Sequence, residues 1–251
     1  MRTERVLQLQ PRLMPHQVEF VMDDKTPIQA LVGGYRSGKS VAGTWKSLRC
    51  AVELFPGERG VIMSPISGMN QTNIVPILRE IMPKTGLDYD EDRLMSERCY
   101  RLDIKVGDKI SSIYLDVSAE NAKRMVGRSL AWGYFDEADV CRNADLAYSA
   151  FTQLKNRLSE ADHPLLFATS TPEGYGFMHK KFVEEAHDDT KIWHVSMEDN
   201  FLLPAGYVAE QLKNIPASKQ AAYIKGQFAN IYSSTVYKDF DRDLNNTHPI
   251  S

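Results

Sequence analysis

The sequence predicts an α/β fold with a mainly parallel central sheet flanked by helices. Apolar segments of strand length alternate along the chain with segments whose apolar residues recur at helical spacing. The first apolar segment ends in glycines, and a later one ends in acidic residues. Alternating strands and helices favour parallel pairing, because each helix returns the chain to the same edge of the sheet.

The first half of the chain supplies strands and helices in turn. Residues 15–24 have the pattern of a short amphipathic helix, with the apolar set Val18, Phe20, Val21 and Met22. The next elements are a buried strand over 28–34, a helix over 39–55, a second strand over 60–66 and a helix over 70–82. Proline lacks the amide hydrogen that a helix interior uses, so we expect Pro76 to bend the last helix or to end a turn.

The second half begins with a β-hairpin over 100–117, predicted because an alternating pattern surrounds the turn sequence VGDK. The later elements are a strand over 130–139, a helix over 144–158, strands over 163–174 and 191–197, and helices over 204–215 and 218–228. Residues 236–251 are polar and show no periodicity, as expected of a linker.

Composition narrows the classes of function. The 251 residues carry a net charge of −3, from 30 Lys and Arg against 33 Asp and Glu, so any contact with DNA needs a local patch or another domain. The three cysteines form no C-x-x-C pair, which favours neither a zinc site nor a disulfide framework and suits a reducing cytosolic setting. No segment resembles a signal peptide, and no apolar run approaches the roughly 20 residues that span a bilayer, so we expect no membrane partner.

Residues 33–40 match the phosphate-binding pattern G-x-x-x-x-G-K-[ST] in full. Such a loop turns its amide groups inward at the start of a helix, where they hold phosphates; its lysine reaches the β- and γ-phosphates and its last hydroxyl binds Mg²⁺. Arg36 is unusual in this loop; it senses the γ-phosphate, meets a neighbouring subunit, or is simply solvated. The candidate nucleotide-binding residues are Gly33, Gly34, Tyr35, Arg36, Ser37, Gly38, Lys39 and Ser40.

Two later segments complete the predicted site. Asp136 and Glu137 end an apolar strand, where one carboxylate can hold Mg²⁺ and the other can activate water; the other interpretation is an acidic helix cap or a solvated turn. Thr169, Ser170 and Thr171 end the next strand and are candidates for coupling nucleotide state to movement, or else cap a turn before Pro172. The spacing of Lys123, Arg124 and Arg128 by itself indicates a solvated basic turn.

Taken together, the segments GGYRSGKS, GYFDEAD and ATSTPEG resemble the ATPase domain of a large terminase subunit, the motor that packages DNA into tailed-phage capsids. LMPHQVEF is similar to the adenine-reading segment of that family, which puts Gln17 on the base. KRMVGRS is similar to the segment that carries an arginine finger acting across subunits. Many relatives have arginine where this chain has Val126, so Arg124 and Arg128 are both candidates, and we favour Arg124. YIKGQFANIYSSTVYKDFDR is similar to the passage from ATPase to nuclease, so the resemblance spans roughly residues 14–240.

The resemblance implies Mg²⁺-dependent ATP hydrolysis that drives double-stranded DNA into a procapsid. It implies a P-loop ATPase domain over 1–235 with a small helical lid near 1–25 and 200–230, and a linker over 236–251 toward an absent nuclease, so we expect no DNA cleavage. The implied partners are double-stranded DNA, a small terminase subunit and further copies in a ring on the portal, in the host cytoplasm. The Asp-Glu-Ala-Asp string at 136–139 also suits the first core domain of a DEAD-type helicase. A switch that binds ATP without turnover is a third possibility, which Glu137 argues against.

Overall fold

The computed structural model describes residues 13–231, and its centre is one eight-stranded sheet in the order β3-β4-β5-β2-β6-β7-β1-β8. The strands are β1 (Ile28–Gly33), β2 (Arg59–Ser64), β3 (Asp88–Tyr89), β4 (Arg101–Val106), β5 (Lys109–Ser118), β6 (Trp132–Phe135), β7 (Leu165–Ser170) and β8 (Thr190–Val195). The helices are α1 (Pro15–Met22), α2 (Lys39–Arg49), α3 (Met69–Thr85), α4 (Glu91–Met95), α5 (Ala144–Lys155), α6 (Phe177–His179), α7 (Tyr207–Asn214) and α8 (Ala217–Tyr223).

The pairing of the strands confirms the predicted α/β class. From β5 through β2, β6, β7 and β1 to β8 every pair is parallel, whereas β3, β4 and β5 are antiparallel. The predicted hairpin is the β4–β5 pair, in which Val106 lies opposite Lys109. The parallel strands therefore direct their carboxyl ends to one edge of the sheet.

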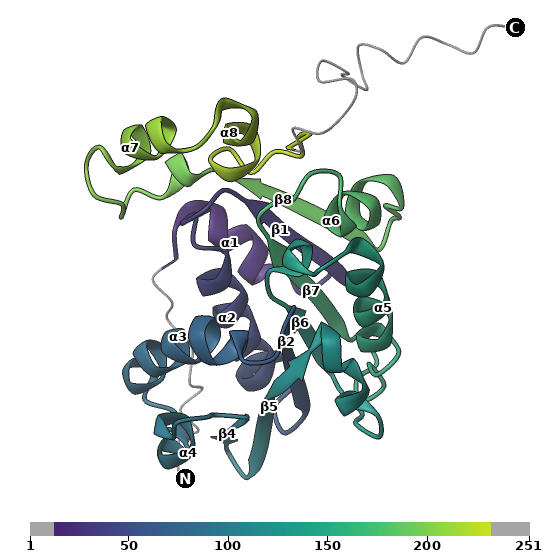
Figure 1. The fold of residues 1–251 in the computed structure, drawn as a ribbon. Helices are drawn as coiled ribbons and strands as arrows, with labels where there is room; N and C mark the ends of the chain where they lie inside the picture. Colours follow the sequence, from purple (N-terminus) through teal and green to yellow (C-terminus); the bar gives the residue numbers. More distant parts are fainter. Residues whose placement is uncertain (1–12, 232–251) are drawn as a thin grey trace, which may run out of the picture.

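Helices cover both faces of the sheet, α1, α2 and α3 on one side and α5 and α6 on the other (Figure 1). Neighbouring residues of one strand point to opposite faces, so each strand contributes to two separate cores. On β1, Leu31 packs in the cluster that contains Phe20 of α1, whereas Ala30 packs in the cluster that contains Phe151 of α5. Burial on both faces explains why β1 is apolar nearly throughout rather than alternating.

Of the four apolar residues in the amphipathic pattern predicted for α1, the structure buries two. Phe20 and Val21 are buried as predicted, and the Phe20 ring contacts those of Phe167 and Trp193. Val18 and Met22 are instead 42% and 51% exposed. A helix of eight residues packs one face against α2, and these two positions, one turn apart, lie on the other face.

Of the two outcomes predicted for Pro76, a bend or the end of a turn, the second does not occur, because α3 continues through Pro76 and Pro83 to Thr85. Proline removes one backbone hydrogen bond within a helix. Buried Val75 and Leu78 flank Pro76, and their packing holds the helix against the sheet despite this loss.

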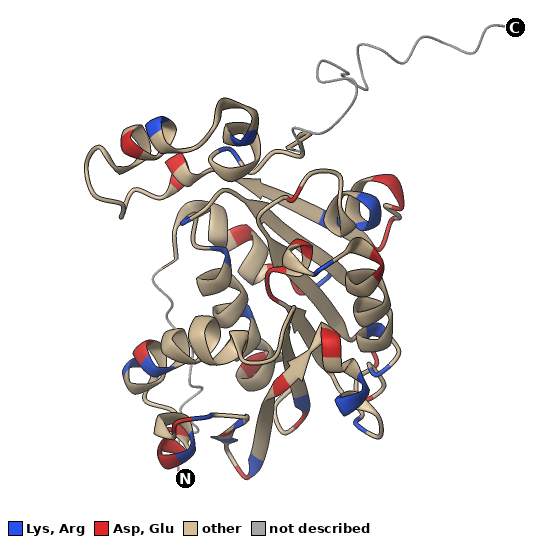
Figure 2. Ribbon diagram, in the orientation of Figure 1, with Lys and Arg blue, Asp and Glu red and all other residues tan. Residues whose placement is uncertain are grey.

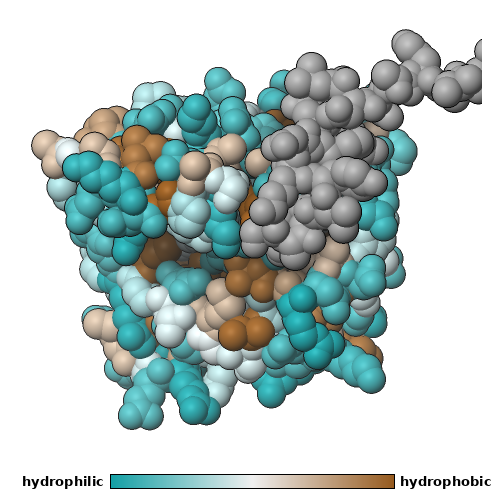
Figure 3. All heavy atoms as spheres, turned by 45° about the horizontal axis from the view of Figure 1, so that its top comes forward, coloured by the Kyte–Doolittle hydropathy of each residue, from teal (hydrophilic) through white to brown (hydrophobic). Residues whose placement is uncertain are grey.

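The C-terminal helices α7 and α8 lie above the carboxyl ends of β1 and β8 (Figure 1), in the region where a lid was expected. Residues 1–12 of that expected lid and the predicted linker over 236–251 fall outside the described residues. Lys and Arg are interspersed with Asp and Glu over the helices and loops, while the central strands carry few charges (Figure 2). The face that includes the top of the molecule is largely hydrophilic, with hydrophobic residues in several separate patches (Figure 3). Within residues 13–231, no helix combines the length and apolar composition needed to cross a bilayer.

Candidate nucleotide-binding site

The predicted phosphate loop connects β1 to the first turn of α2, as its sequence motif requires. Arg36 and Gly38 adopt left-handed backbone conformations, with φ of +57° and +84°. Only glycine adopts this conformation without strain, which explains Gly38 at the helix start. The loop therefore presents its amide groups at the amino end of α2, where partial positive charge favours an anion.

Lys39 is buried within this loop, and its Nζ donates a hydrogen bond to the Gly34 carbonyl at 2.9 Å. Burial lowers the pKa of Lys39, while the negative charges of Glu137 and Asp136 oppose that shift. The predicted lysine and the predicted acidic pair are thus close enough to interact electrostatically, although they are distant in sequence.

The carboxylate of Asp136 accepts hydrogen bonds from hydroxyl groups on three elements. Its Oδ1 accepts hydrogen bonds from Ser40 Oγ at 3.1 Å, from Thr169 Oγ1 at 2.7 Å and from Tyr134 OH at 2.7 Å. The start of α2, the acidic end of β6 and the end of β7 therefore meet at one oxygen atom. Tyr134 was not among the predicted site residues; its position two residues before Asp136, on the same face of β6, was the available signal.

Glu137 follows at the end of β6 in a left-handed conformation, with φ of +51°. Such a conformation costs about 1–2 kcal/mol outside glycine, so the surrounding contacts must hold it. One of these contacts is the Thr171 amide, which donates to Glu137 Oε2 at 3.3 Å. Burial raises the pKa of Glu137, the Lys39 charge lowers it, and the Asp136 charge raises it further.

The predicted coupling turn is tied to the loop after β6 by Asp139. The Asp139 carboxylate accepts hydrogen bonds from the amides of Met178 at 2.8 Å and Glu173 at 3.4 Å. Its own amide donates to Ser170 Oγ at 3.0 Å. Burial raises the pKa of Asp139 to about 6. Thr169, Ser170 and Thr171 therefore each contact a different acidic residue of the 136–139 segment, through Asp136, Asp139 and Glu137 respectively.

Gln17, predicted to read the base, lies in α1 directly beside the loop. Its Nε2 donates to the Gly38 carbonyl at 2.9 Å, and its Oε1 accepts from the Met14 amide at 2.8 Å. The side chain is 2% exposed. Both ends of the amide are thus bonded within the chain, and contact with a base would require one of these bonds to be exchanged.

The two candidate finger arginines lie at another part of the sheet. Arg128 forms a two-pronged ion pair with Asp116 on β5, both bonds at 2.8 Å, and lies over the Tyr114 ring. Arg124 is exposed, and its Nη1 donates to the Asp116 carbonyl at 3.2 Å. Three strands separate β5 from β1, a span of roughly 19 Å between the two strands. The structure does not bring these arginines to the phosphate loop of their own chain.

The donor set of the site suits Mg²⁺. Among residues 13–231, no three His, Cys, Asp or Glu side chains gather in a way that could hold a metal by themselves. A metal at this site would therefore combine the Ser40 hydroxyl and the Asp136 carboxylate, 3.1 Å apart, with oxygens of a ligand and water. Hydroxyl, carboxylate and phosphate oxygens are the hard ligands that Mg²⁺ prefers.

Comparison with known proteins identifies a matching family model and several solved structures of similar fold. The family model for the N-terminal part of terminase large subunits of the T4-like-virus type matches residues 30–243. No curated protein matches the chain.

Three solved structures have a similar fold. The large terminase of a thermophilic bacteriophage has a TM-score of 0.72 at 19% identity, over 93% of this chain and 57% of its own. The ATPase domain of the Thermus phage P74-26 large terminase has a TM-score of 0.68 at 18% identity, over 89% of this chain and 96% of its own. The HK97 bacteriophage large terminase has a TM-score of 0.63 at 16% identity, over 90% of this chain and 55% of its own. The chain thus spans a little over half the length of the first and third proteins.

Proposed function

Since the chain belongs to the T4-like-virus-type family of terminase large subunits, we propose that it hydrolyses ATP to power the packaging of double-stranded DNA. The observation that carries this proposal is the convergence of the hydroxyl groups of Ser40, Tyr134 and Thr169 on Asp136 Oδ1, beside Lys39 and Glu137. Solved complexes of the thermophilic phage terminase with ADP and with ATP-γ-S give further support.

The phosphates of ATP would bind where the loop amides meet the amino end of α2. Lys39 would exchange its bond to the Gly34 carbonyl for the β- and γ-phosphate oxygens. The favourable charge interaction with phosphate would offset the cost of keeping this ammonium group buried. Gln17, once released from the Gly38 carbonyl, would be placed to contact the adenine.

Ser40 and Asp136 would hold Mg²⁺, which when bound would supply positive charge to stabilise the phosphates during hydrolysis. The hydrogen bonds from Tyr134 and Thr169 fix the orientation of the Asp136 carboxylate for this task. Thr169 therefore links the metal site to the turn over 169–171, through which we propose that hydrolysis is relayed to movement.

Glu137 is our candidate for the general base, which orients water for attack on the γ-phosphate and accepts its proton. Burial raises the pKa of this carboxyl group, which makes its carboxylate a stronger proton acceptor. The Thr171 amide holds the carboxylate from the side of the turn, so a shift of that turn would displace the base.

Neither of the two candidate finger arginines lies at the phosphate loop of its own chain, so a finger at the γ-phosphate would have to come from another copy. Arg124 is exposed, whereas the guanidinium of Arg128 is engaged by Asp116. We therefore favour Arg124 as a finger supplied by a neighbouring copy in a ring, which would form on the portal of the procapsid in the host cytoplasm. Arg36 at the loop tip is exposed and would also face such a neighbour.

The remaining parts of the proposal concern the whole motor. The ATPase domain would extend over 1–235, with 236–251 leading to the part of its longer relatives that this chain does not match, and DNA cleavage would reside there. Double-stranded DNA and a small terminase subunit would be the other partners. The helicase alternative has less support, because the matching family model is that of terminases.

Steady-state ATPase assays with and without Mg²⁺ test the proposal. Replacing Glu137 by Gln should lower kcat by about 10²–10⁴-fold while ATP still binds, because only the proton acceptor is lost. Lys39→Ala should lose both binding and turnover, and Glu210→Gln on the exposed face of α7 is the matched control. ATP binding without turnover in the wild-type chain would favour a switch instead. Full turnover by Glu137→Gln would assign the base elsewhere.

A further inference from the structure

Tyr223, the last residue of α8, lies where three segments of the molecule meet. The Tyr35 amide of the phosphate loop donates to its carbonyl at 2.7 Å, and the two tyrosine rings stack with centroids 4.6 Å apart. Its hydroxyl donates to Glu173 Oε2 at 3.1 Å, on the turn that follows β7. We call Tyr35, Tyr223 and Glu173 the tyrosine clasp.

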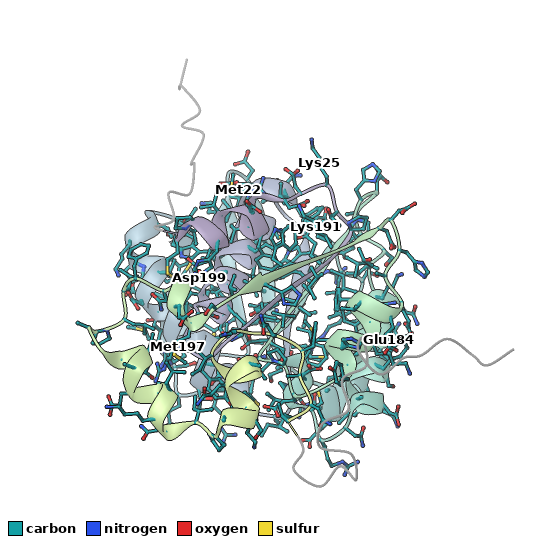
Figure 4. The ribbon with its side chains drawn as sticks, turned by 90° about the horizontal axis from the view of Figure 1, so that it is seen from above. Met22, Lys25, Glu184, Lys191, Met197 and Asp199 are labelled. Atoms are coloured by element: carbon teal, nitrogen blue, oxygen red, sulfur yellow. The ribbon has the colours of Figure 1, made fainter. Side chains whose placement is uncertain are left out.

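The end of α8 lies directly on the phosphate loop. A β-carbon at Gly34 would collide with the carbonyl of Ile224, so this close approach requires glycine. A second contact comes from the segment before α7, where Asn200 Nδ2 donates to the Arg36 carbonyl at 2.6 Å. Viewed from above, Met197 and Asp199 of this segment lie beside the C-terminal helices, while Lys191 lies at the other end of β8 (Figure 4).

The clasp also lies beside the proposed base. Burial raises the pKa of the Tyr35 hydroxyl, the hydrogen bond with Tyr223 lowers it, and the charges of Glu173 and Glu137 raise it further. The Glu173 amide in turn donates to the Asp139 carboxylate. The clasp is therefore continuous with the loop that carries Glu137 and with the turn over 169–171.

The attachment of the C-terminal helices depends on few contacts. None of the residues of α7 is buried, and in α8 only Ala222 is. Elements with so little buried surface separate from a domain at low free-energy cost. Tyr223 and Ile224 thus form much of the connection between these helices and the site.

We propose that Tyr223 and Glu173 are positioning residues for ATP hydrolysis, which hold the phosphate loop and the coupling turn in register and link both to α7 and α8. This inference rests on the proposed ATPase function. Neither residue needs to touch ATP. The stacked ring fixes the loop through Tyr35, the hydroxyl fixes the turn through Glu173, and the backbone carries any displacement to the helices.

A double-mutant cycle in the full chain tests the hydroxyl–carboxylate bond. Tyr223→Phe keeps the ring stack and loses the bond, and Glu173→Ala loses the same bond from the other side. Each should lower kcat about tenfold with KM within about twofold, because the bond orients groups rather than binding ATP. The double variant should be no slower than either single variant. Glu173→Gln, which keeps an acceptor oxygen, should restore most of kcat, and Tyr175→Phe, exposed on the same turn, should change nothing.

The inference would be overturned if the two losses of kcat multiplied in the double variant, or if Tyr223→Phe kept the wild-type kcat. Amide hydrogen exchange without nucleotide separates this failure from that of the proposed function. Loss of the bond in Tyr223→Phe should speed exchange in both 169–176 and 217–224, whereas Tyr175→Phe should leave both unchanged. If the wild-type chain hydrolyses no ATP, the proposed function falls and the exchange result alone decides on the clasp. Unchanged exchange in Tyr223→Phe would overturn it.

Discussion

The carboxyl ends of the parallel strands form one edge of the sheet, and the burial of polar side chains differs between the two ends of that edge. Around β1, β6 and β7 the polar side chains are largely buried and bond to one another, as Asp136 does with Tyr134 and Thr169. At the other end, in the segment that follows β5 along the chain, the basic residues lie nearer the surface, and Arg128 forms an ion pair with Asp116. We propose that the first end binds the phosphates and the metal within one chain. The second end carries the exposed Arg124, and we propose that this residue completes the site of a neighbouring copy, so that the two ends are complementary between copies.

The largest effect expected from breaking this complementarity is in Arg124→Ala. If the guanidinium stabilises charge on the γ-phosphate of a neighbour, its loss should lower kcat by about 10³-fold or more. Equilibrium binding of ATP should change little, because the loop and Lys39 are untouched. ATPase rates and nucleotide titrations on the same preparation measure both quantities.

Lys123→Ala is the matched control for that variant, since Lys123 is the adjacent exposed cation. It should retain near-wild-type turnover. An equal loss in both variants would mean that the general positive charge of this segment matters, rather than a positioned guanidinium.

An intermediate effect concerns the buried end and its dependence on pH. Burial raises the pKa of Asp139 from 3.8 to about 6, so the folded protein binds this proton more tightly than the unfolded chain does. Stability should therefore fall as pH rises from about 4 to 6, and the ionised carboxyl should cost up to about 3 kcal/mol above that range. Asp139→Asn removes this charge. In urea unfolding from pH 4 to 8, the free energy of unfolding of the variant relative to wild type should rise with pH by up to that amount. A difference that does not change with pH would contradict the assignment.

The smallest effect is expected at the surface pair. Arg128→Ala should lower the free energy of unfolding by about 1 kcal/mol, because a partly exposed ion pair and its ring contact contribute little. Turnover per folded protein should stay within a few-fold of wild type. A large loss of kcat without a loss of stability would make Arg128, and not Arg124, the finger.

The sequence predicted those parts of the fold and site that depend on neighbouring residues. The phosphate loop follows from one unbroken motif between a strand and a helix, and the β4–β5 hairpin follows from the turn sequence around Gly107. The acidic end of β6 was likewise visible, because Asp136 and Glu137 follow an apolar run. Their roles in the site stay predictions.

The remaining features depend on which strands are neighbours, and a single sequence does not contain that information. Tyr134 and Thr169 meet because β6 pairs with β7, although the two residues are 35 positions apart. Tyr223 reaches Tyr35 only through the return of the C-terminal helices over β1. The helix does not end at Pro76, because packing of the long helix α3 outweighs one lost hydrogen bond, and the local sequence does not reveal that packing.

The most direct test of the central claim, that a neighbour's arginine completes the site, is to mix two inactive variants. Glu137→Gln lacks the base but keeps Arg124, and Arg124→Ala lacks the arginine but keeps the base. Across a series of protein concentrations, the mixture should regain ATPase activity that neither variant has alone, and the gain should grow with concentration. Activity equal to the sum of the separate variants at every concentration would contradict a site shared between copies.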